Sequence, residues 1–287
     1  MPGPTAAPLG PVAAPGPGGA GRDRPGCSRQ ESLDRLDYGP GMGATELLVV
    51  RHGESVGNTA ARAAQEVRAE VIDVPARDAD VGLSATGVDQ ARALGTWLGE
   101  LDADRAPQSV WSSPYVRSAD TARLALEVSG LRLPIVLDER LRDRELGVLD
   151  KLTGFGVEAR HPAEAARRRW VGKFYYRPPG GESWADMALR LRSVLADVDR
   201  YEDGRRVLVV CHDAVTMLIR YICEGLTEAE IMAIGRATPV LNASVTRLVR
   251  DPGERLWRLD TFNAVEHLAE QGAVRTAPRG KTDVVAE

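Results

Sequence analysis

The chain has 287 residues, of which 43% are hydrophobic and 27% charged, which is ordinary for a folded globular protein of one large or two small domains. Its formal net charge of −4 argues against nucleic acid as a partner, since nucleic-acid-binding proteins usually carry a basic excess. No apolar run approaches the roughly 20 residues of a membrane span, so we expect no membrane partner either.

Cysteine usage and the N-terminal sequence predict a cytoplasmic protein. The three cysteines are odd in number, and Cys211 and Cys223 lie in strongly apolar sequence, as expected of reduced thiols. The N-terminus lacks the basic start and apolar stretch of a secretory signal. Residues 1–44 are rich in Pro, Gly and Ala and are predicted to be disordered, as is the tail over 269–287.

Between these ends, over residues 45–268, strands alternate with helices. Strands are predicted at 46–51, 108–112, 134–137, 206–211, 244–249 and 256–260. Helices are predicted at 86–102, 114–129, 157–171, 183–202, 213–224 and 227–236, and several begin with capping residues such as Ser113-Pro114. The alternation predicts an α/β fold: a three-layer α/β/α sandwich with a mainly parallel central sheet.

Two of the four histidines directly follow predicted strands. Arg51-His52-Gly53 comes after the first strand and His212 after the fourth. Ligands of open α/β sheets bind at the carboxyl ends of the strands, so this placement indicates a shared site. Arg51 and the amides at the start of a following helix would favour an anion there. The alternative for His52 is a capped histidine of the core.

Arg117 is placed one turn into the helix that begins after Ser112-Ser113-Pro114. From there its guanidinium could reach the same sheet edge and bind two oxygens of a phosphoryl group. The alternative is a surface arginine in an arginine-rich chain. No cysteine is followed six residues later by arginine, so the loop of cysteine-dependent phosphatases is absent.

Asp143 and Glu145 lie two residues apart in the segment that follows the third predicted strand. In an extended loop they would share a side, and either carboxyl group could donate a proton near a phosphoryl site. The alternative is a solvated run of charges.

Five short motifs in this order resemble the histidine phosphatase superfamily, in its phosphoglycerate-mutase-like branch, over about residues 46–262. They are Arg51-His52-Gly53-Glu54-Ser55 with Asn58, Leu83-Ser84-x-x-Gly87-x-x-Gln90-Ala91, Ser112-Ser113-Pro114-x-x-Arg117-x-x-x-Thr121-Ala122, Gly180-Gly181-Glu182-Ser183, and His212. The resemblance implies the fold of that family and chemistry on a phosphoryl group.

The resemblance also implies roles for individual residues. His52 would be the nucleophile that forms a phosphohistidine, and Asp143 would be the proton donor, with Glu145 as the second candidate. The phosphoryl oxygens would be held by Arg51, Asn58, Arg117 and His212. No metal or cofactor is implied, because the cationic side chains supply the positive charge.

Three features of the sequence are less regular. Asp213 stands where the family often has glycine after its second histidine, and its carboxylate would have to point away from a phosphate. Glu182 is expected in a supporting role near the substrate, although acidic residues are also common at helix starts. The basic and aromatic segment 157–177, including Arg177, is either a lid that binds the rest of the substrate or a solvated helix face.

These observations favour a metal-independent phosphatase that acts on a small phosphorylated substrate. A phosphoglycerate mutase is the alternative, but the tyrosine- and arginine-rich pattern after Gly-Glu-Ser and the early Phe-Thr-Gly-Trp stretch of cofactor-dependent mutases are absent. A non-catalytic protein that binds phosphorylated ligands is the third interpretation. The protein is expected to be a monomer or a homodimer.

Overall fold

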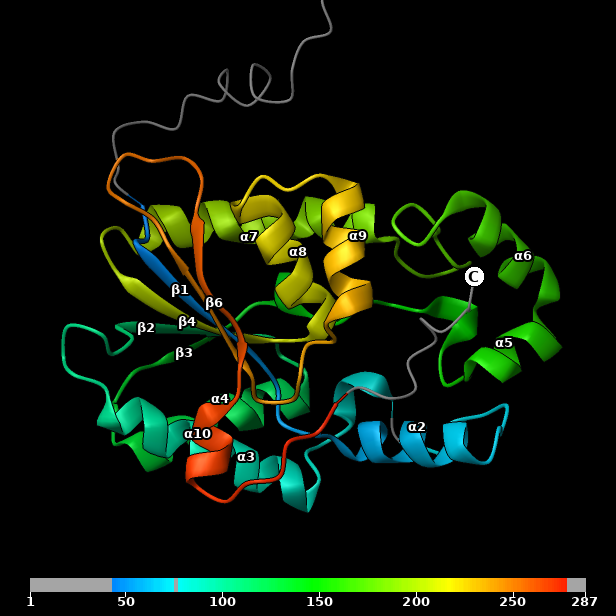
Figure 1. Cartoon of the computed structure of the whole chain (residues 1–287), viewed down its shortest axis with the longest axis horizontal. Helices are drawn as coiled ribbons and strands as arrows, with labels where there is room; N and C mark the ends of the chain where they lie inside the picture. The colour runs from blue at the N-terminus through cyan, green and yellow to red at the C-terminus, as the bar shows by residue number, and fades with distance from the viewer. Residues whose placement is uncertain (1–42, 75–76, 278–287) are drawn as a thin grey trace, which may run out of the picture. The chain divides into compact units, whose positions relative to one another are not determined.

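A computed structural model describes residues 43–74 and 77–277 (Figure 1). The predicted disorder of residues 1–44 falls outside this range except at Gly43 and Ala44, and Ala44 is fully buried. At the other end, the Gln90 side chain donates to the carbonyl of Val274 and to the hydroxyl of Thr276. Val274 and Thr276, within the segment 269–287 that was predicted to be a disordered tail, thus contact the domain.

The centre of the domain is a six-stranded sheet in the order β3-β2-β4-β1-β5-β6. Its strands are β1 (Glu46–Arg51), β2 (Ser109–Ser112), β3 (Ile135–Leu137), β4 (Arg206–Cys211), β5 (Val245–Val249) and β6 (Arg258–Ala264). The four strands β3, β2, β4 and β1 are parallel, whereas β5 runs antiparallel to both of its neighbours. The predicted mainly parallel sheet is thus confirmed.

Helices cover both faces of this sheet (Figure 1). One layer holds α3 (Ala85–Glu100), α4 (Val116–Ser129) and α10 (Glu266–Glu270), and the other holds α7 (Trp184–Tyr201), α8 (Asp213–Cys223) and α9 (Glu228–Ala237). Because alternate side chains of a strand point to opposite faces, β1 serves both cores. Leu47 and Val49 pack with α7 and α8, and Leu48 and Val50 with α3 and α4.

The predicted helix over 157–171 is wrong as a single element. The chain instead forms α5 (Gly154–Arg160) and α6 (Pro162–Val171), with His161 between them at φ −133° and ψ 55°. Pro162 has no N–H to continue the ladder, and its ring disfavours helical dihedrals in the preceding residue. Together with α2 (Val56–Glu66), these helices lie beside the three-layer body (Figure 1).

Helix α2 (Val56–Glu66) was missed within a stretch that sequence analysis left without structure. Its start carries a readable signal, because Ser55 and Asn58 form a reciprocal capping box. Val157 of α5 and Ala165 of α6 pack with Leu149 and Tyr176 in a separate apolar cluster.

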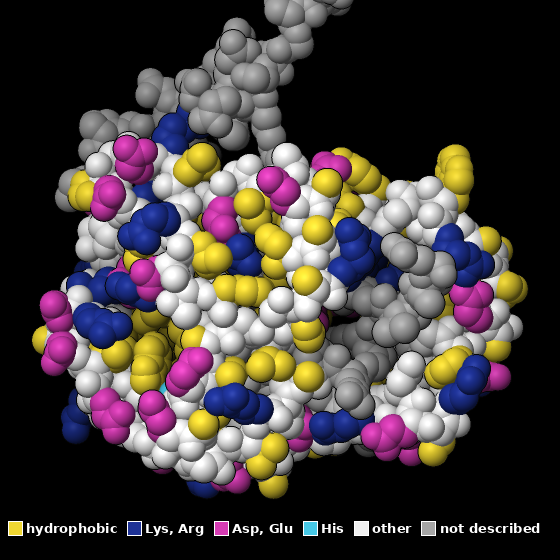
Figure 2. Space-filling view, in the orientation of Figure 1, with side chains coloured by type: hydrophobic (Ala, Val, Ile, Leu, Met, Phe, Trp, Pro, Cys, Tyr) yellow, Lys and Arg dark blue, Asp and Glu magenta, His cyan; other side chains and the backbone are white. Residues whose placement is uncertain are grey.

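On the face shown in Figure 2, acidic and basic side chains are interspersed among apolar ones rather than separated by sign. None of the helices in residues 43–74 and 77–277 combines the length and apolar character needed to cross a membrane.

Candidate active site

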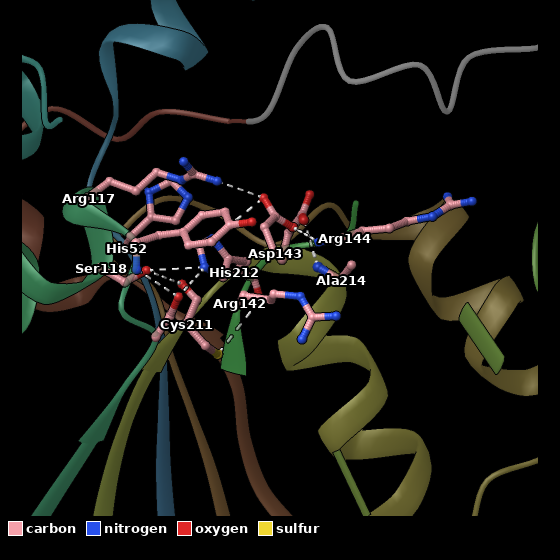
Figure 3. Close-up of polar contacts among 12 residues, drawn as sticks. His52, Arg117, Ser118, Arg142, Asp143, Arg144, Cys211, His212 and Ala214 are labelled. Atoms are coloured by element: carbon pink, nitrogen blue, oxygen red, sulfur yellow. Dashed lines mark hydrogen bonds and ion pairs between the residues drawn. The ribbon is translucent and has the colours of Figure 1, made fainter. Parts of the chain in front are cut away.

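His52 and His212 lie side by side because β1 and β4 are adjacent and parallel, with Arg51 in register with Cys211. The backbone N–H of His52 extends this ladder by donating to the carbonyl of Cys211 at 2.9 Å. The two imidazole rings meet edge to face, with centroids 5.2 Å apart (Figure 3). The sheet therefore delivers both histidines to one point at the carboxyl end of its strands.

The tautomer of His52 follows from its own backbone. Nδ1 lies 2.6 Å from the carbonyl oxygen of Gly53, and a carbonyl can only accept, so Nδ1 carries the proton. Nε2 is then left with a lone pair. Burial lowers the pKa of His52 well below its ordinary value, and the positive charge of Arg117 acts in the same direction. The side chain is thus neutral, with the lone pair of Nε2 available.

Two glycines hold the turn after β1 against the start of α3. A Cβ on Gly53 would lie 2.5 Å from the carbonyl oxygen of Gly87, and one on Gly87 would lie 1.9 Å from that of Glu54. The Thr121 hydroxyl accepts from the N–H of Gly53, and the Gln90 amide oxygen from that of Glu54. The absence of a side chain at Gly53 therefore lets the backbone of Gly87 approach closely.

Arg51 is almost fully buried, and its Nη1 donates to the carbonyl of Val240 at 2.6 Å. Burial lowers its pKa, while the negative charges of Asp213 and Asp143 act against this effect. A guanidinium in such a position adds positive charge beside His52 without exposure to solvent.

Arg117 is 2% exposed and reaches the same region from α4. Its Nη2 lies 3.0 Å from a carboxylate oxygen of Asp143 and 3.0 Å from one of Asp78. Burial lowers the pKa of Arg117, but the two carboxylates outweigh it and the pKa is raised. The guanidinium therefore keeps its charge in the interior.

His212 is fully buried and shares a 2.9 Å hydrogen bond through Nε2 with the hydroxyl of Ser113. Its Nδ1 lies 3.5 Å from Asp143. Asp143 therefore sits between Arg117 and His212, as Figure 3 shows, and its other oxygen accepts from the backbone N–H of Arg144. The structure thus brings together five predicted residues, namely Arg51, His52, Arg117, Asp143 and His212.

Glu145 is held differently from Asp143. Its side chain is half exposed and accepts a 2.7 Å hydrogen bond from the hydroxyl of Tyr115. Tyr115 in turn places its ring edge to face with His212 and under the guanidinium of Arg117. Among the described contacts, Glu145 therefore reaches the cluster through Tyr115.

Glu182 supports the loop that carries the two candidate acids. It accepts from Arg142 and twice from Arg190. Arg190 also donates to three carbonyls of that loop, those of Arg140, Arg142 and Asp143. Glu182 is therefore placed to hold this loop in position through Arg142 and Arg190.

The side chains of Asn58 and Arg177 have their described contacts outside the five clustered residues. The Asn58 amide oxygen caps α2 and accepts from Asn242, whose amide also donates to the carbonyl of His52. Arg177 is 63% exposed and pairs with Asp186 at the start of α7. Within the described residues it contacts none of the five clustered side chains.

Asp213 turns its carboxylate onto its own helix, where Oδ1 accepts from the backbone N–H of Ala214 at 2.6 Å.

Asp78, Tyr115 and Ser113 were not singled out as site residues. The position of Ser113 directly after a predicted strand and before Pro114 is a sequence signal that could have identified it. The contacts of Asp78 with Arg117 and of Tyr115 with His212 depend on tertiary packing, so local sequence does not reveal them. In the described part of the chain, no group of three or more His, Cys, Asp or Glu side chains could hold a metal ion.

Residues 47–265 match the family model of the histidine phosphatase superfamily, branch 1. The chain belongs to this family. It is 29% identical over 234 residues to a metal-independent phosphoserine phosphatase of Arabidopsis thaliana, covering 79% of this chain and 85% of that protein. It is 32% identical over 208 residues to a 2,3-bisphosphoglycerate-dependent phosphoglycerate mutase of Methylobacterium radiotolerans, covering 70% and 91%.

Solved structures agree with the observed fold. A mycobacterial glucosyl-3-phosphoglycerate phosphatase in complex with inorganic phosphate superimposes with a TM-score of 0.60 at 30% identity, covering 78% of this chain and 99% of that one. Phosphatases and mutases both occur among these relatives, so chemistry on a phosphoryl group is the property they share.

Proposed function

We propose that this histidine phosphatase family member is a metal-independent phosphomonoesterase that hydrolyses a small phosphate monoester through a phosphohistidine on His52. The observation that carries the proposal is the 2.6 Å hydrogen bond from Nδ1 to the carbonyl of Gly53, which leaves Nε2 unprotonated. Around this nitrogen lie Arg51, Arg117 and His212, with a buried carboxyl group, Asp143, beside them.

The first step transfers the phosphoryl group to the protein. Nε2 of His52 attacks phosphorus, the bond from phosphorus to the ester oxygen breaks, and Asp143 in its acid form gives its proton to the departing alcohol. Arg51 and Arg117 stabilise the charge on the three equatorial oxygens, and His212 adds a further contact.

The second step regenerates the protein. Water attacks phosphorus while the Asp143 carboxylate takes a proton from it, the bond to Nε2 breaks, and inorganic phosphate leaves. Asp143 is then protonated and His52 again neutral, so atoms and charges balance over the cycle. Splitting hydrolysis in this way replaces one difficult displacement by two easier ones.

Transfer to a second hydroxyl group, as in a phosphoglycerate mutase, is the second candidate. The 32% identity to such a mutase favours it. Hydrolysis is favoured because the carboxylates of Asp78 and Glu145 lie near Tyr115 beside the cluster and would repel the carboxylate of a phosphoglycerate bound there.

The test is rapid-quench labelling with 32P-labelled phosphoserine and 3-phosphoglycerate. We expect an acid-labile label on the wild-type protein and release of inorganic phosphate, both lost in His52→Ala. His161→Ala is the matched control, because His161 lies between α5 and α6 and takes no part in the cluster. Isomer exchange without phosphate release would identify a mutase instead. Label that persists in His52→Ala would refute the assignment of the nucleophile.

A further inference from the structure

Asp78 contacts the phosphoryl-binding arginine at two points. It is the first residue of the short 3-10 helix η1 (Asp78–Asp80). Nη1 of Arg117 donates to its backbone carbonyl at 2.6 Å, and Nη2 donates to its carboxylate at 3.0 Å. The two contacts occupy the terminal nitrogens of the guanidinium, the groups best placed to bind two oxygens of a phosphate.

The carboxylate and a phosphoryl group would compete for the same positive charge. Arg117 is 2% exposed, and its Nη2 already serves Asp143 as well as Asp78. A phosphoryl dianion that enters here meets a guanidinium that is already paired with the Asp78 carboxylate and in contact with the Asp143 carboxyl group. Because interactions between charges are strong where water is excluded, both the repulsion and the competition weaken phosphate binding.

The Asp78 carboxylate can leave Arg117 while the turn Asp78–Asp80 keeps its shape. The Asp78 side chain is 36% exposed, so it has solvent to move into. The backbone contact to Nη1 does not depend on the carboxylate, and the turn is closed by hydrogen bonds from Asp80 to Arg77 and from Val81 to Asp78.

We propose that Asp78 is a specificity-determining residue that competes with the phosphoryl group for Arg117 and so sets a low affinity for phosphate itself. This inference rests on the proposed function. Its consequence is that a substrate needs contacts beyond its phosphoryl group to displace the carboxylate, whereas the product, inorganic phosphate, lacks such contacts and leaves readily.

The test is calorimetric titration of the full chain with inorganic phosphate, which needs no turnover. We expect Asp78→Asn to tighten phosphate binding by about tenfold, because it removes one charge-assisted competitor and keeps the shape and the backbone contact. Asp78→Ala should tighten it at least as much. Asp80→Asn is the matched control: Asp80 lies in the same turn, is exposed, pairs with Arg77, and should leave the affinity unchanged.

The possible outcomes separate the inference from the proposed function. Equal or weaker phosphate binding by both Asp78 variants would overturn the inference and make Asp78 a support for Arg117. Equal tightening by Asp80→Asn would also overturn it, because a general change in charge would then suffice. Phosphate binding absent from every variant would overturn the phosphoryl site itself and with it the proposed function.

Discussion

At the scale of single residues, two carboxyl groups could donate the proton, and their surroundings distinguish them. Asp143 is 4% exposed and lies between Arg117 and His212. Glu145 points its carboxylate to Tyr115 and is half exposed. Proton transfer requires the donor to lie within hydrogen-bond reach of the leaving oxygen. Of these two candidate donors, Asp143 is the one with described contacts to side chains expected to bind the phosphoryl group.

We therefore expect Asp143→Asn to lower kcat by about 10²- to 10⁴-fold, the usual contribution of a positioned acid. Glu145→Gln should change kcat little, since its amide can still accept from Tyr115. Steady-state kinetics on an aryl phosphate and on an alkyl phosphate would check this, because the poorer alkyl leaving group depends more on the acid. A greater loss in Glu145→Gln would assign the donor role to Glu145.

At the scale of elements, the site depends on how closely the start of α3 approaches the turn after β1. The approach is possible because Gly87 has no side chain: a Cβ would lie 1.9 Å from the carbonyl oxygen of Glu54. Backbone atoms cannot move aside as a flexible side chain would. A larger residue must therefore displace the turn that carries His52.

Gly87→Ala is expected to lower the free energy of unfolding by about 1–3 kcal/mol or more, as overpacking of a protein interior does. It should also lower kcat, because His52 moves with the turn. Gly235→Ala is the matched control. Gly235 also lies in a helix, but its added Cβ would meet only Met217 at an ordinary 3.5 Å, and the protein should gain about 0.5–1 kcal/mol. Urea unfolding measures both, and equal effects would contradict the packing argument.

At the scale of the whole molecule, a third buried histidine links stability to pH. His267 in α10 is 4% exposed and donates from Nε2 to the carbonyl of Ala243 at 3.0 Å. Burial lowers its pKa from 6.5 to about 4. The unfolded chain therefore takes up a proton at this site at a higher pH than the folded one does, and acid favours unfolding.

The stability supplied by neutral His267 should be complete above pH 6.5 and should be lost as the pH falls towards about 4. The loss amounts to about 3 kcal/mol, after which the folded protein is protonated too. His267→Gln keeps a donor for Ala243 and cannot titrate, so its free energy of unfolding should fall less over this range. Urea unfolding of both proteins between pH 7 and pH 4 measures the difference; parallel curves would contradict the shifted pKa.

The sequence by itself determined the fold class and the main chemical groups. Apolar runs that end at Arg51-His52 and at Cys211-His212 identify buried strands, and parallel strands bring their carboxyl ends to one edge. Alternation and capping also placed most helices within a few residues of their observed ends. These signals are local, since they depend on residues near one another in the chain.

Only the tertiary structure decided how those groups are held. Asp78 pairs with Arg117, which lies 39 positions away, and Asn242 joins Asn58 to the backbone of His52 across more than 180 positions. The tertiary structure also gives Asp143 and Glu145 different partners, Arg117 for the first and Tyr115 for the second, although the two lie only two residues apart. It pairs Arg177 with Asp186 rather than with the cluster. Contacts of this kind follow from loop paths and packing in three dimensions, and no periodicity or local motif encodes them.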